Sequence, residues 1–130
     1  MRDERAQQGS LAVPIRLMHG DYRTLLGQHL FPAGHRIVSF LAPPRADALN
    51  ARTGLDLSRT RPPLGAVVSD FERVYPDNAI LYVVEVHERL VPEPLAELCA
   101  HFDWSELSIF DIAGPTGRHG VLLGTKRWHA

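Results

Sequence analysis

Titratable side chains in the C-terminal half of the chain could carry acid–base chemistry if the fold brings them together. Glu85 and His87 interrupt an apolar stretch, and Asp111 lies within the apolar sequence Ile109–Ile112. A carboxylate on an apolar sheet face has to be solvated, paired or used in chemistry. A carboxylate and a histidine are the minimum equipment for general acid–base catalysis, so Glu85, His87 and Asp111 are candidate catalytic residues, with His119 as a fourth. The alternative is that water or an arginine satisfies the acids.

The segment from Gly114 to Gly120 is a candidate anion-binding loop. Its three glycines, Gly114, Gly117 and Gly120, let backbone N–H groups approach an anion closely. Arg118 and His119 add charge that is positive or changes with pH. The same residues are also good turn formers, so a purely structural turn is the alternative. The segment lacks the Gly-Lys-Ser/Thr sequence of a Walker phosphate loop.

Charge is unevenly distributed along a chain whose net charge is −1. Residues 1–62 carry nine arginines against five acids, residues 63–111 two arginines against ten acids, and residues 112–130 three basic residues without an acid. This pattern predicts a basic face for an anionic partner and an acidic face for a cationic protein surface, unless the three blocks interleave in space. The candidate anion-binding residues are Arg36, Arg45, Arg52, Arg59, Arg61, Arg118, Lys126 and Arg127, with Trp128 as a stacking platform.

Several classes of protein are excluded by composition and spacing. Cys99 is the only cysteine, so no disulfide forms within the chain, and its place on an apolar helix stripe suggests a packed thiol. The seven histidines show no metal-ligand spacing, so we expect neither a metal nor a cofactor. The longest apolar run, Ala79–Val84, is far shorter than the roughly 20 residues of a membrane-spanning helix, and the first residues do not resemble a signal peptide. We therefore expect a soluble, cytoplasmic protein that does not bind membranes.

The elements that position these residues follow from hydrophobic periodicity and from turn-forming residues. The pattern predicts a flexible N-terminal segment at 1–10 and a single domain at 11–130. The fold class is α+β, with the order β-α-β-α-α-β-α-β-β and a mixed, largely antiparallel sheet that has helices mainly on one face. The predicted strands are 11–18, 35–42, 79–87, 108–113 and 121–125, and the predicted helices are 21–30, 45–52, 64–75 and one that begins at Glu93.

Three functional hypotheses are compatible with this sequence. The first is a binding or regulatory protein that uses its basic and acidic surfaces on a protein or nucleic-acid partner. The second is a small hydrolase or transferase with its pocket at Glu85, His87, Asp111 and the glycine loop. The third is a subunit of a larger assembly, which includes a homo-oligomer. An exposed sheet edge at Leu11–Met18 could then pair with a strand of another subunit. The residues alone leave open whether the protein is an enzyme.

Overall fold

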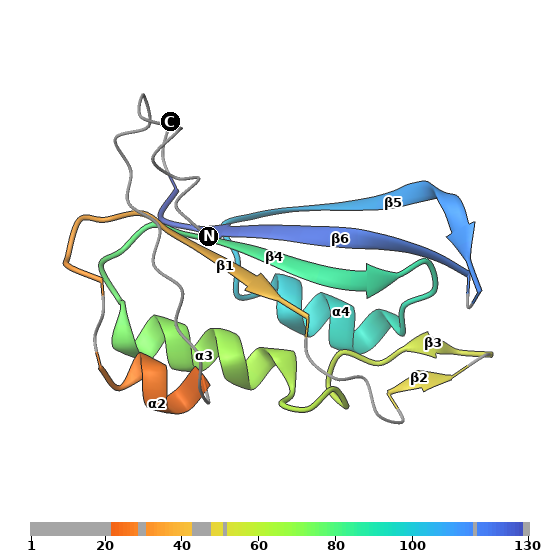
Figure 1. Ribbon diagram of the computed structural model, residues 1–130, viewed down its shortest axis with the longest axis horizontal. Helices are drawn as coiled ribbons and strands as arrows, with labels where there is room; N and C mark the ends of the chain where they lie inside the picture. The colour runs from red at the N-terminus through yellow and green to blue at the C-terminus, as the bar shows by residue number, and fades with distance from the viewer. Residues whose placement is uncertain (1–21, 29–30, 43–47, 51, 116, 129–130) are drawn as a thin grey trace, which may run out of the picture.

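The structure, a computed structural model, describes residues 22–28, 31–42, 48–50, 52–115 and 117–128, which form two layers. A four-stranded sheet makes one layer, and the helices with a two-stranded sheet make the other (Figure 1). This arrangement confirms the α+β class with a mixed sheet. In chain order the elements are α2 (Tyr22–Leu26), β1 (Ile37–Leu41), β2 (Leu49–Asn50), β3 (Gly54–Leu55), α3 (Leu64–Val74), β4 (Ile80–His87), α4 (Pro92–Cys99), β5 (Trp104–Gly114) and β6 (Gly117–Lys126).

The four-stranded sheet has the strand order β1-β4-β6-β5. β1 runs parallel to β4, with Ile37 opposite Ile80, whereas β6 is antiparallel to both of its neighbours. A parallel pair requires a crossover connection, and here the crossover carries β2, β3 and α3 into the helix layer. The sheet is therefore mixed and largely antiparallel, as the sequence predicts.

β4 is an inner strand of the sheet, as its apolar sequence predicts. Alternate side chains point to opposite faces of a strand, so only every second residue of β4 can reach the helix layer. The helices of the described chain lie against one face of the sheet only (Figure 1). The residues of β4 that face the helices are fully buried: Ile80, Tyr82, Val84 and Val86.

The two longer helices begin and end where proline and apolar spacing predict. α3 follows Pro63, buries Leu64, Val67 and Val68 at helical spacing, and ends before Pro76, which cannot continue a helix. α4 begins with Pro92 in its first turn and buries Leu98. Both helices therefore turn an apolar stripe toward the sheet.

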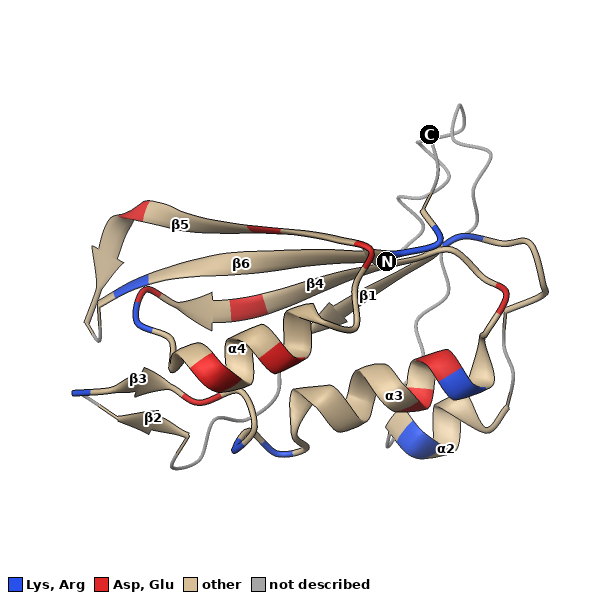
Figure 2. Ribbon diagram, turned by 180° about the vertical axis from the view of Figure 1, so that it is seen from behind, with Lys and Arg blue, Asp and Glu red and all other residues tan. Residues whose placement is uncertain are grey.

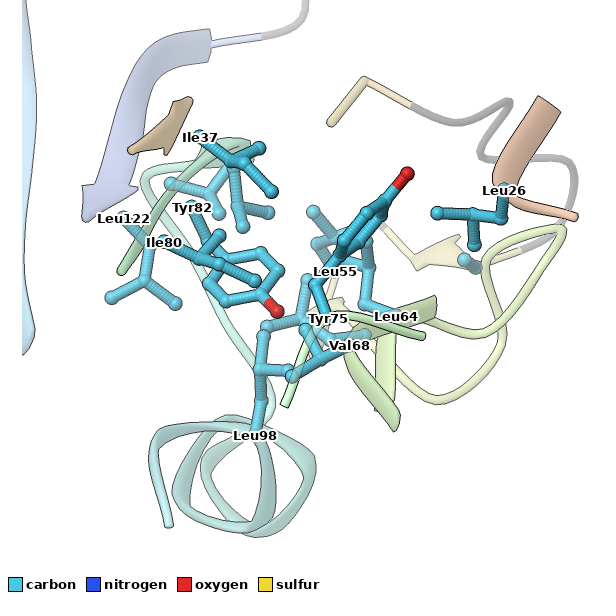
Figure 3. Packing of buried hydrophobic residues seen from close by; sticks show 14 residues of the cluster. Leu26, Ile37, Leu55, Leu64, Val68, Tyr75, Ile80, Tyr82, Leu98 and Leu122 are labelled. Atoms are coloured by element: carbon cyan, nitrogen blue, oxygen red, sulfur yellow. The ribbon is translucent and has the colours of Figure 1, made fainter. Parts of the chain in front are cut away.

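The core lies between the two layers and is centred on Tyr82. Figure 3 shows this side chain pointing from β4 into the cluster that α3 and α4 close from the other side. The Tyr82 ring lies edge-on to Phe71, with centroids 5.8 Å apart, and 5.4 Å from the ring of Phe102. The Tyr82 hydroxyl donates a hydrogen bond of 2.8 Å to Glu72 Oε2, which satisfies the polar end of the ring. Burial, and then Glu72, raise the pKa of Tyr82 above its ordinary value.

The predicted helix at 45–52 is wrong for the residues that the structure describes there. Leu49 and Asn50 form β2, which pairs with β3. The Asn50 side-chain oxygen accepts hydrogen bonds from the backbone N–H groups of Arg52 at 2.7 Å and Thr53 at 3.2 Å. An asparagine that bonds its own backbone in this way favours a turn over a helix. Gly54 then has a φ of 97°, a conformation in which glycine is favoured.

Other boundaries differ in length from the predicted ones. α2 is shorter than the predicted helix 21–30, and the two C-terminal strands are longer than 108–113 and 121–125. The predicted edge strand Leu11–Met18 and the segment 1–10 lie outside the described residues. No helix in the described part of the chain is long and apolar enough to cross a membrane.

Candidate functional site

The sheet face turned away from the helices, called here the open face, carries three of the four candidate catalytic residues. Strand register places its side chains in four rows across the sheet. The first two rows are mainly apolar, and the last two hold a carboxylate and two imidazoles. The rows are Val38, Leu81, Thr125 and Trp104; then Phe40, Val83, Leu123 and Glu106; then Glu85, Val121 and Ser108; and finally His87 and His119.

Large apolar side chains on the open face are exposed. The exposed fractions are 63% for Val38, 64% for Phe40 and 49% for Trp104. In Figure 1 none of the described helices or strands packs over this face of the sheet. Single exposed apolar residues are ordinary on a protein surface, but a continuous apolar patch marks an interaction site. The open face therefore has the composition of an interface.

The polar end of the open face brings together Glu85, His87 and His119. His87 and His119 face each other across β4 and β6, with ring centroids 5.7 Å apart and planes at 86°. His87 is only 6% exposed, and its Nδ1 accepts a hydrogen bond of 3.2 Å from the backbone N–H of Arg89. A neutral His87 ring then carries its proton on Nε2. This arrangement places a carboxylate and two imidazoles on one face of the sheet, and their use in proton transfer stays a prediction.

Asp111, the other predicted catalytic acid, has a different environment. It is exposed in an irregular stretch of β5, where the register shifts between Ile109 and Ala113. Its charge acts on Arg118, as a minor contribution to the raised pKa of that guanidinium. The acid–base hypothesis for these four residues therefore stays a prediction.

The glycine segment is a tighter connection than the sequence predicts. β5 ends at Gly114 and β6 begins at Gly117, so two residues separate the strands. Gly117 has a φ of 113°, and a Cβ atom on it would lie 2.9 Å from His87 Nε2. Gly120 lies within β6 and pairs with Ile109 of β5, and a Cβ atom on it would overlap the backbone of Ser108. These glycines allow the hairpin to pack closely against β4 and His87, and their role as an anion loop stays a prediction.

Three of the predicted anion-binding residues instead form ion pairs with the acidic block of the chain. Arg118 Nε lies 2.8 Å from Glu88 Oε1, Lys126 Nζ 3.4 Å from Asp103 Oδ1, and Arg127 Nη1 2.7 Å from Glu72 Oε1. The side-chain hydrogen bond from Arg118 holds the pKa of Glu88 below its ordinary value. The backbone N–H of Arg127 does the same for Asp103. The C-terminal basic block and the acidic block therefore interleave in space, which Figure 2 shows as alternating blue and red.

The remaining predicted anion-binding residues are divided between two regions. The Arg36 guanidinium stacks 5.0 Å from the centre of the Trp128 ring. Arg59 and Arg61 line a shallow hollow, and Arg23 of α2, which the sequence does not single out, lines it with them. Arg52 is exposed beside the β2–β3 turn, and Arg45 lies outside the described residues.

Metal-binding geometry does not occur in the part of the chain that the structure describes. No group of three or more His, Cys, Asp and Glu side chains there could hold a metal ion. Cys99 is half-buried on α4, against the hydrophobic core.

The apolar half of the open face is the feature that sequence reasoning missed. Its signal is present in β1, where Val38 and Phe40 alternate with the inward-facing Ile37 and Ser39. A strand that has apolar side chains on both of its faces needs other elements packed against both faces. The helices of the described residues are too few to cover two faces, so counting helices against apolar strands could have found this surface.

Comparison of the chain with protein-family models, with curated proteins and with solved structures found no match. The open face and the basic hollow are therefore the two features that point to a function.

Proposed function

We propose that the protein is a protein-binding subunit of a larger assembly and that the open face is its interface. The observation that carries this proposal is the exposure of Val38, Phe40 and Trp104 in two adjacent apolar rows. Monomeric proteins rarely leave a continuous apolar surface of this kind in water. Aromatic residues are also enriched at the centres of interfaces.

The free energy available from covering this face is substantial. An aromatic side chain has an area of about 150–250 Å². Phe40 is 64% exposed, so it leaves on the order of 100–150 Å² in water, worth roughly 3 kcal/mol at about 25 cal/mol per Å². Trp104 and Val38 add to this value. A partner that covers both rows gains the central, desolvated contacts that dominate the energy of an interface.

Site-specific photocrosslinking tests the proposed function without knowledge of the partner. We expect p-benzoylphenylalanine in place of Phe40 to form a discrete protein adduct when the chain is irradiated in its cells of origin. The matched control places the same residue at Ala96, which is exposed on α4 in the opposite layer. Irradiation at position 96 is expected to give none of this adduct. The absence of any adduct at position 40, or the same adducts at both positions, contradicts the proposed function.

Anion binding is a second candidate function, favoured by the hollow that Arg23, Arg59 and Arg61 line together with Ser58 and Thr60. Guanidinium groups bind phosphate in a bidentate geometry, and a cluster of them attracts polyanions.

Fluorescence anisotropy with a short labelled oligonucleotide at two salt concentrations tests this second candidate. Binding should weaken with salt and should weaken further in Arg61→Gln. Arg89→Gln, which removes the same charge from an exposed side chain outside the hollow, should leave the affinity unchanged. No binding at low salt, or equal losses in both variants, eliminates this candidate.

A further inference from the structure

The geometry points to a second copy of this chain as the partner of the open face. We propose that two open faces pack against each other about a two-fold axis, with the β4 strands of the two copies running antiparallel. This inference rests on the proposed function, because it identifies the partner of the same surface. Its support comes from the size of the face, from the order of its rows and from the charges at its ends.

The size of the open face fits a specific dimer. Four strands spaced about 4.8 Å apart are roughly 19 Å wide, and the eight paired residues of β4 are roughly 26 Å long at about 3.3 Å per residue. The face therefore has a plan area of roughly 500 Å², and the relief of the side chains raises its accessible area further. Stable interfaces bury about 600–1,000 Å² on each partner.

The order of the rows makes the open face complementary to itself. A two-fold axis between the first and second rows lays Val38 and Leu81 of one copy over Phe40 and Val83 of the other. Sheets that pack face to face bury interdigitating apolar side chains in this way, with their strands nearly aligned. One patch thus supplies both halves of the contact, which is the property of a two-fold interface.

The charges at the two ends of β4 decide the direction of packing. Arg36 lies directly before β1, beside the start of β4, and Glu85 lies near the end of β4. The two-fold arrangement places the end that carries Arg36 over Glu85 of the second copy. Parallel stacking would instead place Glu85 over Glu85. Electrostatic complementarity therefore favours the antiparallel dimer.

Sedimentation equilibrium of the purified full chain tests the dimer. We expect a dimer at micromolar concentration, and Phe40→Glu should weaken it by about 100-fold or more, because it places a charge at the centre of the contact. Leu107→Glu is the matched control. Leu107 is 44% exposed, and its register with the buried Leu122 places it on the helix-side face. Circular dichroism and thermal melting establish that both variants are folded, and an equal effect of both variants on the dimer overturns the inference.

A charge exchange tests the direction of packing. Arg36→Glu and Glu85→Arg should each weaken the dimer, and the double variant should restore it. The two residues lie near opposite ends of β4, so restoration requires a contact between copies. Additive losses in the double variant overturn the antiparallel arrangement.

The outcomes separate this inference from the proposed function. A purified chain that remains monomeric at 100 µM overturns the dimer. If position 40 nevertheless crosslinks to a different protein in cells, the proposed function stands and only the second copy is wrong. An adduct within the chain, to residues 1–21, contradicts both.

Discussion

Replacing Arg127 by alanine should destabilise the fold, because this side chain connects the end of β6 to α3 and to the segment that follows it. Its Nη1 lies 2.7 Å from Glu72 Oε1, its Nε donates to the carbonyl of Asn78 at 2.8 Å, and its Nη2 donates to the carbonyl of Tyr75 at 3.1 Å. Glu72 also accepts a hydrogen bond from the hydroxyl of the fully buried Tyr82. The alanine variant therefore removes the guanidinium from a carboxylate that keeps its hydrogen bond with Tyr82, and removes a charged donor from two backbone carbonyls.

The expected decrease in the free energy of unfolding lies between the contributions of exposed and of buried ion pairs. The side chains of Arg127 and Glu72 are 28% and 21% exposed. Exposed pairs contribute about 0–1 kcal/mol, whereas hydrogen bonds to charged groups contribute about 1.5–3 kcal/mol. Since solvent screens this pair only in part, we expect the free energy of unfolding to fall by about 2–3 kcal/mol. For a chain of this size the melting temperature should then fall by roughly 6–12 °C.

Urea and thermal unfolding of Arg127→Ala beside Lys126→Ala provide the assay. Lys126 is the matched control, because its ion pair with Asp103 is longer, at 3.4 Å, and Asp103 is 54% exposed. Its removal should cost less than about 1 kcal/mol. A double-mutant cycle of Arg127→Ala with Glu72→Gln should give a coupling above about 1 kcal/mol. Equal losses in both single variants, or coupling near zero, refute the reasoning and leave Arg127 available to an external anion.

Two further predictions concern packing and acid stability. Gly124→Ala should destabilise the fold by about 1–3 kcal/mol in urea unfolding, because its Cβ would overlap the ring of Phe102, whereas Gly65→Ala, with open space around it, should be neutral or stabilising. Similar losses in both variants contradict this account. The hydrogen bond from Arg73 holds the pKa of Asp70 below 3.8. The stability that this carboxylate contributes is therefore present above pH 4 and disappears as the pH falls through its folded-state pKa. In Asp70→Asn, the free energy of unfolding measured as a function of pH should therefore fall less steeply below pH 4 than in the unmodified chain. An unchanged slope below pH 4 contradicts the prediction.

The elements that the sequence predicts well are those whose burial is regular. Ala79–Val84 is apolar throughout, and the structure has β4 at Ile80–His87. The helix at 64–75 shows a single apolar stripe bounded by two prolines, and α3 occupies Leu64–Val74. In both segments local propensity and tertiary burial favour the same conformation, so a pattern in one sequence is sufficient to identify them.

The elements that the sequence predicts poorly depend on contacts between distant residues. β2 has two residues, and its conformation depends on the side chain of Asn50 and on pairing with β3. The start of β5, at Trp104, is exposed and has no alternation of polar and apolar residues, so only its pairing with Thr125 reveals the strand. The rows of the open face likewise exist only through strand register. That register brings His119 opposite His87, which no spacing in the sequence indicates.

The parallel pairing of β1 with β4 has a consequence for the order of folding. β5 and β6 form a hairpin whose contacts close a short loop, and β6 is held on its other side by eight residue pairs with β4. β1 is an edge strand that pairs with β4 alone, over five residue pairs, and it reaches β4 only after the chain has passed through β2, β3 and α3, so its few contacts must offset the entropy cost of closing a long loop. We therefore expect β1 to join the sheet last and to detach first in native-state hydrogen exchange. Val38 and Phe40 lie on that strand, so a partner that covers them also holds in place the part of the sheet that is least firmly attached.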